Sequence, residues 1–119
     1  MKIIVPISVG ELLDKISILQ IKSKFTDIPY VLKEKECLIE IAKKNDVYNQ
    51  DFLNQLLDVN SKLWTIEDQL REFEKNHLFD EEFVRNARLI YITNDKRARI
   101  KKEINEKYNS SYREVKVYK

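Results

Sequence analysis

An apolar stripe with helical spacing runs through the middle of the chain. Its members recur every three or four residues for roughly six turns, and they are Phe52, Leu56, Val59, Leu63, Ile66, Leu70 and Phe73. This spacing places all of them on one face of an α-helix, which we predict from about Gln50 to Asn76. A helix this long with one apolar face must bury that face against other elements, so the stripe favours a helical bundle.

Three further helices are predicted around this one. Ser8 is followed three residues later by Glu11, the spacing of a capping box that opens a helix. The chain has only one glycine and two prolines, which are too few turn-forming residues for a β fold with many turns. We therefore predict a mainly α fold, a single helical domain over residues 1–119 with four helices in antiparallel hairpins. The expected helices run from about Val9 to Phe25, Tyr30 to Lys44, Gln50 to Asn76 and Asp80 to Tyr108.

The two ends of the chain have the pattern of short strands. The first is "KIIV", and the second is "REVKVY", in which Val115 and Val117 alternate with Lys116 and Tyr118. Two strands alone are only marginally stable, so they would have to lie on the helices. We expect that they could form a short two-stranded ribbon, with each other or across a dimer.

The first helix and the charge distribution both favour a homodimer. Apolar residues occupy most of the circumference of this helix, so it is either central in the bundle or buried on one side by a partner chain. Residues 1–84 carry 11 basic and 16 acidic side chains, whereas residues 85–119 carry 11 basic and 4 acidic ones. The acidic part of one copy can attract the basic part of a second copy, or the two parts can pack together within one chain.

Polar residues interrupt the core-facing line of the last helix. If Phe83 marks the centre of the buried face, helical spacing brings Asn94, Lys101 and Asn105 onto the same face, and Arg97 flanks them. Buried amide and ammonium groups are costly unless they are hydrogen-bonded. Three interpretations stay open: a small-molecule site, a buried polar network that fixes the helix register or a dimer interface, and a helix half that faces solvent.

The first helix carries polar residues that could complement this line. Asp14 and Gln20 lie opposite its charged wedge, among apolar neighbours. If the two faces meet, they form a polar pocket with both charge signs, a common kind of small-molecule site in helical bundles. The candidate ligand-binding residues are Asn94, Arg97, Lys101, Asn105, Asp14 and Gln20, and a small anion is the ligand that they suit.

The sequence gives little support for nucleic-acid binding or catalysis. The run "KRARIKK" spreads its charges around the helix, and no recognition motif accompanies it, so nucleic acid is an improbable partner. His77 is the only histidine, and Ser17 and Cys37 lack a histidine base. A single glycine excludes a P-loop and a dinucleotide motif. We expect no catalytic residue, no metal site and no cofactor.

The chain also lacks the marks of a membrane or exported protein. No apolar run approaches the roughly 18 residues of a membrane span. Cys37 is the only cysteine, which rules out an internal disulfide and fits a reducing compartment. We therefore predict a cytoplasmic protein.

Three blocks together resemble a family of small uncharacterised bacterial and viral proteins. They are "ISVGELLDKISILQIK" at 7–22, "LWTIEDQLRE" at 63–72 and "ARLIYITNDKRARIKKEIN" at 87–105. The resemblance covers most of the chain and implies an all-helical domain without an established activity, with a weak link to surface-glycan assembly. Our leading interpretation is a non-catalytic module that self-associates and docks a protein partner. The alternative is a binding protein or enzyme for a small anionic ligand held between the first and last helices.

Overall fold

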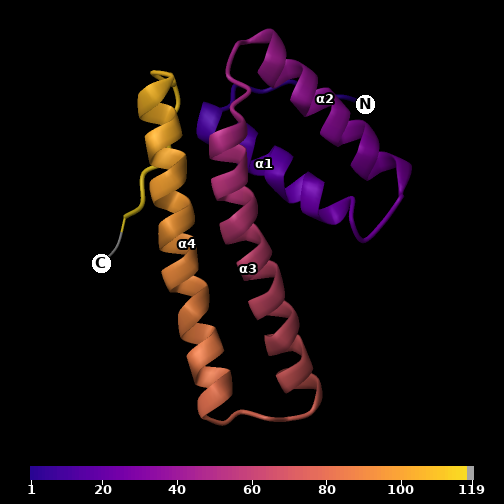
Figure 1. The fold of residues 1–119 in the computed structure, drawn as a ribbon, viewed down its shortest axis with the longest axis vertical. Coiled ribbons are helices and arrows are strands. Elements are labelled where there is room, and N and C mark those ends of the chain that lie inside the picture. Colours follow the sequence, from indigo (N-terminus) through magenta and orange to yellow (C-terminus); the bar gives the residue numbers. More distant parts are fainter. Residues whose placement is uncertain (118–119) are drawn as a thin grey trace.

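The computed structural model describes residues 1–117, which form four helices (Figure 1). The long α3 and α4 make an antiparallel hairpin, and the shorter pair α1 and α2 packs across one end of it. The helix α2 contacts α1 and neither of the long helices. The predicted mainly α fold with four helices in hairpins is confirmed. The helices are α1 (Val9–Lys22), α2 (Pro29–Lys44), α3 (Gln50–Lys75) and α4 (Glu81–Lys107).

Side-chain caps define where most of the helices begin. Ser8, Asn49 and Asp80 each accept a hydrogen bond from a backbone N–H in the first turn of α1, α3 and α4. These bonds satisfy donors that a helix leaves without a partner. The helix α2 begins at Pro29 without a side-chain cap, and the missing N–H of proline is tolerated in a first turn.

The core lies where α1 crosses α3 and α4. Its fully buried apolar side chains include Leu13 and Ile16 of α1, Leu53 and Leu56 of α3 and Ile104 of α4. Because α2, α3 and α4 all pack on α1, this helix is central within a single chain. Its apolar circumference is therefore explained without a partner chain.

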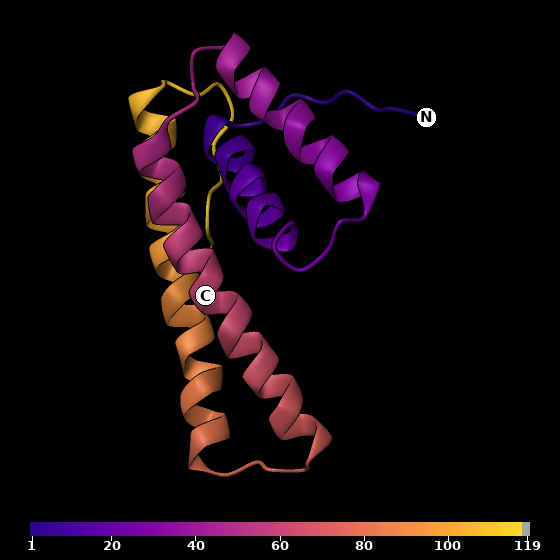
Figure 2. The ribbon, with the colours of Figure 1, turned by 45° about the vertical axis from the view of Figure 1, so that its right-hand side comes forward.

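The two-stranded ribbon that we considered for the ends is not formed within residues 1–117, which contain no strand. The first residues extend past α2, whereas the segment after α4 turns back along that helix (Figure 2). The two ends run apart, and Glu114 of the second segment is bound to Lys101 of α4. Ile3, Val115 and Val117 consequently stay exposed, and Tyr118 lies outside the described residues.

The hairpin of α3 and α4 projects well beyond α1 and α2 (Figures 1 and 2). We call residues 67–92 the outer hairpin. Its exposed apolar side chains are Leu78, Phe79, Val84, Leu89, Tyr91 and Ile92. None of the helices in the described part of the chain is long and apolar enough to cross a membrane.

Candidate functional site

The beginning of α1 lies directly against the last turns of α4, and Gly10 permits this close contact. A Cβ atom added at Gly10 would lie 2.8 Å from the backbone oxygen of Lys101 and 3.0 Å from Oδ1 of Asn105. The first distance is shorter than van der Waals contact allows, and a backbone oxygen within a helix cannot move aside. The only glycine of the chain thus sets the spacing of the two helices.

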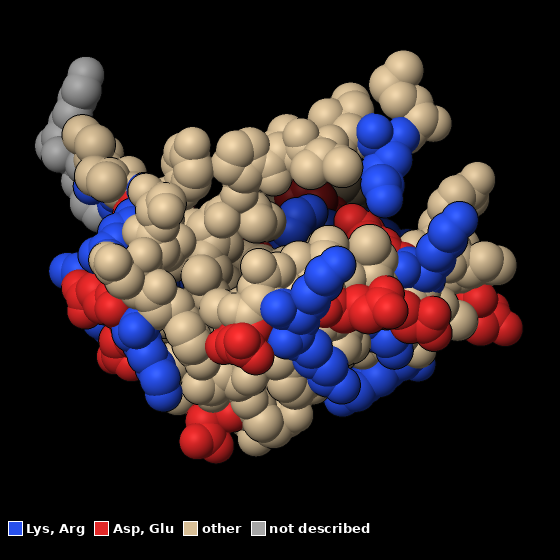
Figure 3. All heavy atoms as spheres, turned by 90° about the horizontal axis from the view of Figure 1, so that it is seen from above, with Lys and Arg blue, Asp and Glu red and all other residues tan. Residues whose placement is uncertain are grey.

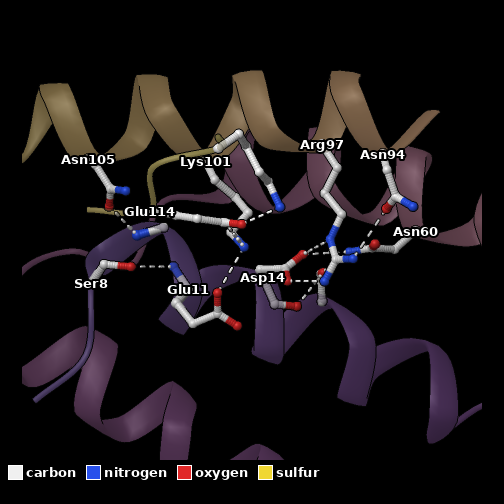
Figure 4. A network of polar contacts seen from close by, with 12 residues as sticks. Ser8, Glu11, Asp14, Asn60, Asn94, Arg97, Lys101, Asn105 and Glu114 are labelled. Atoms are coloured by element: carbon white, nitrogen blue, oxygen red, sulfur yellow. Dashed lines mark hydrogen bonds and ion pairs between the residues drawn. The ribbon is translucent and has the colours of Figure 1, made fainter. Parts of the chain in front are cut away.

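The first three backbone amides of α1 all have side-chain acceptors, two of which come from the far end of the sequence. Figure 4 shows the bonds accepted by Asn105 and Ser8. These are the N–H groups that a helix cannot satisfy by itself. The structure therefore explains Asn105 as a cap for another helix. The bonds join Val9 N to Ser110 Oγ (3.1 Å), Gly10 N to Asn105 Oδ1 (2.7 Å) and Glu11 N to Ser8 Oγ (3.1 Å).

Asp14 of α1 is fully buried and is bound by Arg97 of α4. The Nε of Arg97 donates to Oδ1 of Asp14 at 3.0 Å, and its Nη2 contacts Oδ2. Such two-pronged pairing is the strongest geometry between a guanidinium and a carboxylate. The hydrogen bond to Asp14 raises the pKa of Arg97 by more than burial lowers it. The negative charge of Asp14, which would be costly if it were buried alone, is thereby neutralised by Arg97 of the same chain.

Two amide side chains extend this pair. The Nδ2 of Asn60, in α3, donates to Asp14 Oδ1 at 2.9 Å and to Ser17 Oγ at 2.8 Å. The Oδ1 of Asn94 accepts a long hydrogen bond from Arg97 Nη1 at 3.5 Å. Helices α1, α3 and α4 are therefore joined by one set of polar contacts.

Lys101 is buried between two carboxylates one turn further along α4. Its Nζ lies 2.8 Å from Oε2 of Glu11 and 2.9 Å from Oε2 of Glu114. Burial is the largest single influence and lowers the pKa of Lys101, but the hydrogen bonds to these carboxylates and the negative charges of Glu11 and Asp14 together raise it above its usual value. Glu114 also pairs with Lys116, and the two lysines, Lys116 first, lower the pKa of Glu114 to about 2. The Lys101 ammonium and the Glu114 carboxylate thus stay charged at neutral pH.

Five of the six predicted ligand-binding residues meet in this network (Figure 4), namely Asp14, Asn94, Arg97, Lys101 and Asn105. Gln20 does not join it, and its Oε1 is buried without a hydrogen-bond partner among residues 1–117. The interpretation of a helix half facing solvent is wrong for Lys101 and Asn105, which are 8% and 3% exposed.

Several members of the network were not among the predicted residues. Asn60 follows Val59 of the apolar stripe, and a buried polar residue beside such a stripe is a signal that could have identified it. Glu11 was predicted to close a capping box with Ser8, but its carboxylate turns to Lys101 instead. Glu114 lies in a segment with a strand pattern, which gave no indication of this contact.

The network is built to hold helices together. In the described part of the chain, each of its two cations, Arg97 and Lys101, contacts carboxylates of the same molecule. Over the end of the molecule that carries α1 and α2, basic and acidic side chains are interspersed (Figure 3). That mixture differs from the basic stripe or patch of a nucleic-acid surface.

Comparisons with known proteins identify a family without assigning an activity. No curated protein and no solved structure matches the chain. One family model matches all of it, residues 1–119. The chain therefore belongs to DUF6165, a family of unknown function.

Proposed function

We propose that this protein is a non-catalytic interaction module that self-associates through the outer hairpin. The observation that carries the proposal is the exposed apolar surface of this projection. Phe79 at its tip is 53% exposed, and Leu89 and Ile92 of α4 are each 38% exposed. Exposed apolar side chains on a projecting element are typical of a surface that another protein covers.

The charges along the hairpin support a second copy of the same chain as the occupant. The outer hairpin, residues 67–92, carries seven acidic and four basic side chains, whereas residues 94–107 of α4 carry six basic and three acidic ones. Arg97 and Lys101 are paired with carboxylates of their own chain. Residues 94–107 therefore keep four other basic and three acidic side chains. A parallel pairing would bring two acidic projections together. An antiparallel, two-fold pairing avoids this repulsion.

The alternative of a small anion between α1 and α4 has weaker support. The two cations that it would use, Arg97 and Lys101, are already engaged by Asp14, Glu11 and Glu114. An anion between α1 and α4 would have to displace the hydrogen bonds of Asp14 to Arg97 and of Glu11 to Lys101, which are charge-assisted and partly buried. We also propose that the protein is cytoplasmic, as its sequence predicts. The thiol of Cys37 is exposed and would stay reduced in that compartment.

Light scattering on the purified chain at tens of micromolar tests self-association. We expect twice the chain mass of 14.3 kDa. Ile92→Glu should give monomers because it places a charge in the proposed interface. The matched control is Ile41→Glu on α2, where the original side chain is 40% exposed, close to the 38% of Ile92.

The control variant should remain dimeric. A wild-type chain that stays monomeric at this concentration contradicts the proposal. Ile92→Glu and Ile41→Glu proteins with the same mass would show that the outer hairpin is not the interface.

A further inference from the structure

A groove lies on α4, beneath the segment that follows this helix. It has a volume of about 480 Å³, which is within the usual size range of small-molecule sites. We call it the tail groove. Its lining includes Ala98, Arg99, Lys101 and Lys102 of α4 and Val115 and Lys116 of the returning segment.

The tail groove contains basic side chains that residues 1–117 do not neutralise. Arg99 and Lys102 are exposed and make no ion pair with any residue from 1 to 117. Asp95 is also in the lining but does not pair with them. The apolar surfaces of Ala98 and Val115 form other parts of the wall. This combination suits a compact anion better than a neutral molecule.

The carboxylate of Glu114 already places one anionic group in the groove. One oxygen of its carboxylate lies 2.9 Å from Nζ of Lys101, and the other contacts Lys116. The Glu114 side chain is 38% exposed, and it belongs to an irregular segment rather than to a helix. The carboxylate therefore lies between two ammonium groups in a partly exposed position.

We propose that the tail groove binds a small polyanion, and that Glu114 occupies the place of one anionic group when the ligand is absent. One group of the ligand replaces the Glu114 carboxylate at Lys101 and Lys116, and a second contacts Arg99 and Lys102. Phosphate and carboxylate groups share this chemistry. The site goes beyond self-association, and it differs from the predicted pocket because it lies on the side of Lys101 that faces the returning segment.

Removal of the Glu114 charge should strengthen binding, because the ligand then has no internal competitor. If Glu114 occupies the site nine-tenths of the time, its loss tightens the apparent affinity about tenfold. Loss of the unpaired cations should have the opposite effect. Both effects should be largest at low ionic strength, since added salt screens exposed charges.

Isothermal titration calorimetry at low ionic strength tests the proposal with two probes, inorganic pyrophosphate and citrate. We expect at least one probe to bind the wild type, to bind Glu114→Gln about tenfold more tightly and to lose binding to the double variant Arg99→Gln/Lys102→Gln. The probe that binds more tightly tells whether phosphate or carboxylate is preferred. Circular dichroism verifies that each variant keeps its helices.

Matched controls separate the groove from the general effect of charge. Lys33→Gln/Lys44→Gln removes two exposed cations from α2, and Glu106→Gln removes an exposed carboxylate of α4 outside the groove. Both should bind like the wild type. The proposal is overturned if neither probe binds Glu114→Gln, if Glu106→Gln strengthens binding as much, or if both double variants weaken it equally.

Discussion

Replacement of Arg97 by alanine provides the most direct test of the polar network. The carboxylate of Asp14 is fully buried and receives three hydrogen bonds, two of them from Arg97. Without the guanidinium, a buried charge keeps a single donor, the amide of Asn60. The variant should therefore be much less stable than the wild type, although Arg97 lies outside the apolar core.

The structure also sets the size of this effect. Removal of one partner from a buried ion pair typically costs about 3–5 kcal/mol. The side chain of Arg97 is 27% exposed, so water that enters its place restores part of the solvation of Asp14. We therefore expect a loss of about 3 kcal/mol, the lower end of that range. This loss is a large share of the roughly 5–15 kcal/mol that stabilises an ordinary domain.

Urea unfolding followed by circular dichroism measures this loss, with Arg99→Ala as the control on the same helix. Arg99 is exposed and forms no ion pair with residues 1–117, so its removal should change stability by less than about 0.5 kcal/mol. The double variant Asp14→Asn/Arg97→Met removes both charges and should recover most of the loss. Equal stabilities of Arg97→Ala and Arg99→Ala, or a double variant no more stable than Arg97→Ala, would refute the reasoning.

Three further predictions concern the other contacts between α1, α4 and the returning segment. Gly10→Ala should lower the melting temperature, because overpacking against the backbone of α4 costs about 1–3 kcal/mol and exceeds the gain of about 1 kcal/mol in helix propensity; an unchanged or higher melting temperature contradicts the tight contact. Lys101→Ala should destabilise by about 1–3 kcal/mol and Lys101→Met by less, since methionine keeps the packing of the stem; equal urea midpoints for both variants and the wild type would exclude a stabilising role. The pKa of Glu114 lies below its usual value, so its stabilisation is complete above about pH 4.5 and is lost as pH falls toward about 2. The urea midpoint of the wild type should therefore exceed that of Glu114→Gln at pH 6, and a gap that does not shrink by pH 3 would contradict this linkage.

Local sequence patterns were sufficient to predict the helices. Spacing of three and four residues, together with caps such as Ser8 and Asp80, depends on neighbours in the chain and can be read without tertiary information. The same periodicity shows that α1 is apolar on most sides, but it cannot tell whether the covering surface belongs to the same chain. In the structure that surface is supplied by α2, α3 and α4.

The polar line on α4 was predictable, whereas most of its partners were not. Asn94, Lys101 and Asn105 break a helical pattern, and a break of this kind is visible locally. The groups that satisfy Lys101 lie 90 residues before it and 13 residues after it. Only the fold brings them together, because neither Glu11 nor Glu114 departs from the pattern of its own segment.

The long sequence separation within the network has a consequence for synthesis of the chain. The backbone amide of Gly10 donates to Asn105, which lies 95 positions later in the sequence, and the carboxylate of Asp14 is bound by Arg97, 83 positions later. While a ribosome is still making α4, α1 to α3 can gather through their apolar faces, and the Asp14 side chain then keeps the hydrogen bond from Asn60. Long loops close at a modest entropic cost, so the late arrival of α4 is no obstacle. It follows that this protein reaches its full stability only when its last helix has left the ribosome, and that a chain interrupted before Arg97 would be a substrate for quality control.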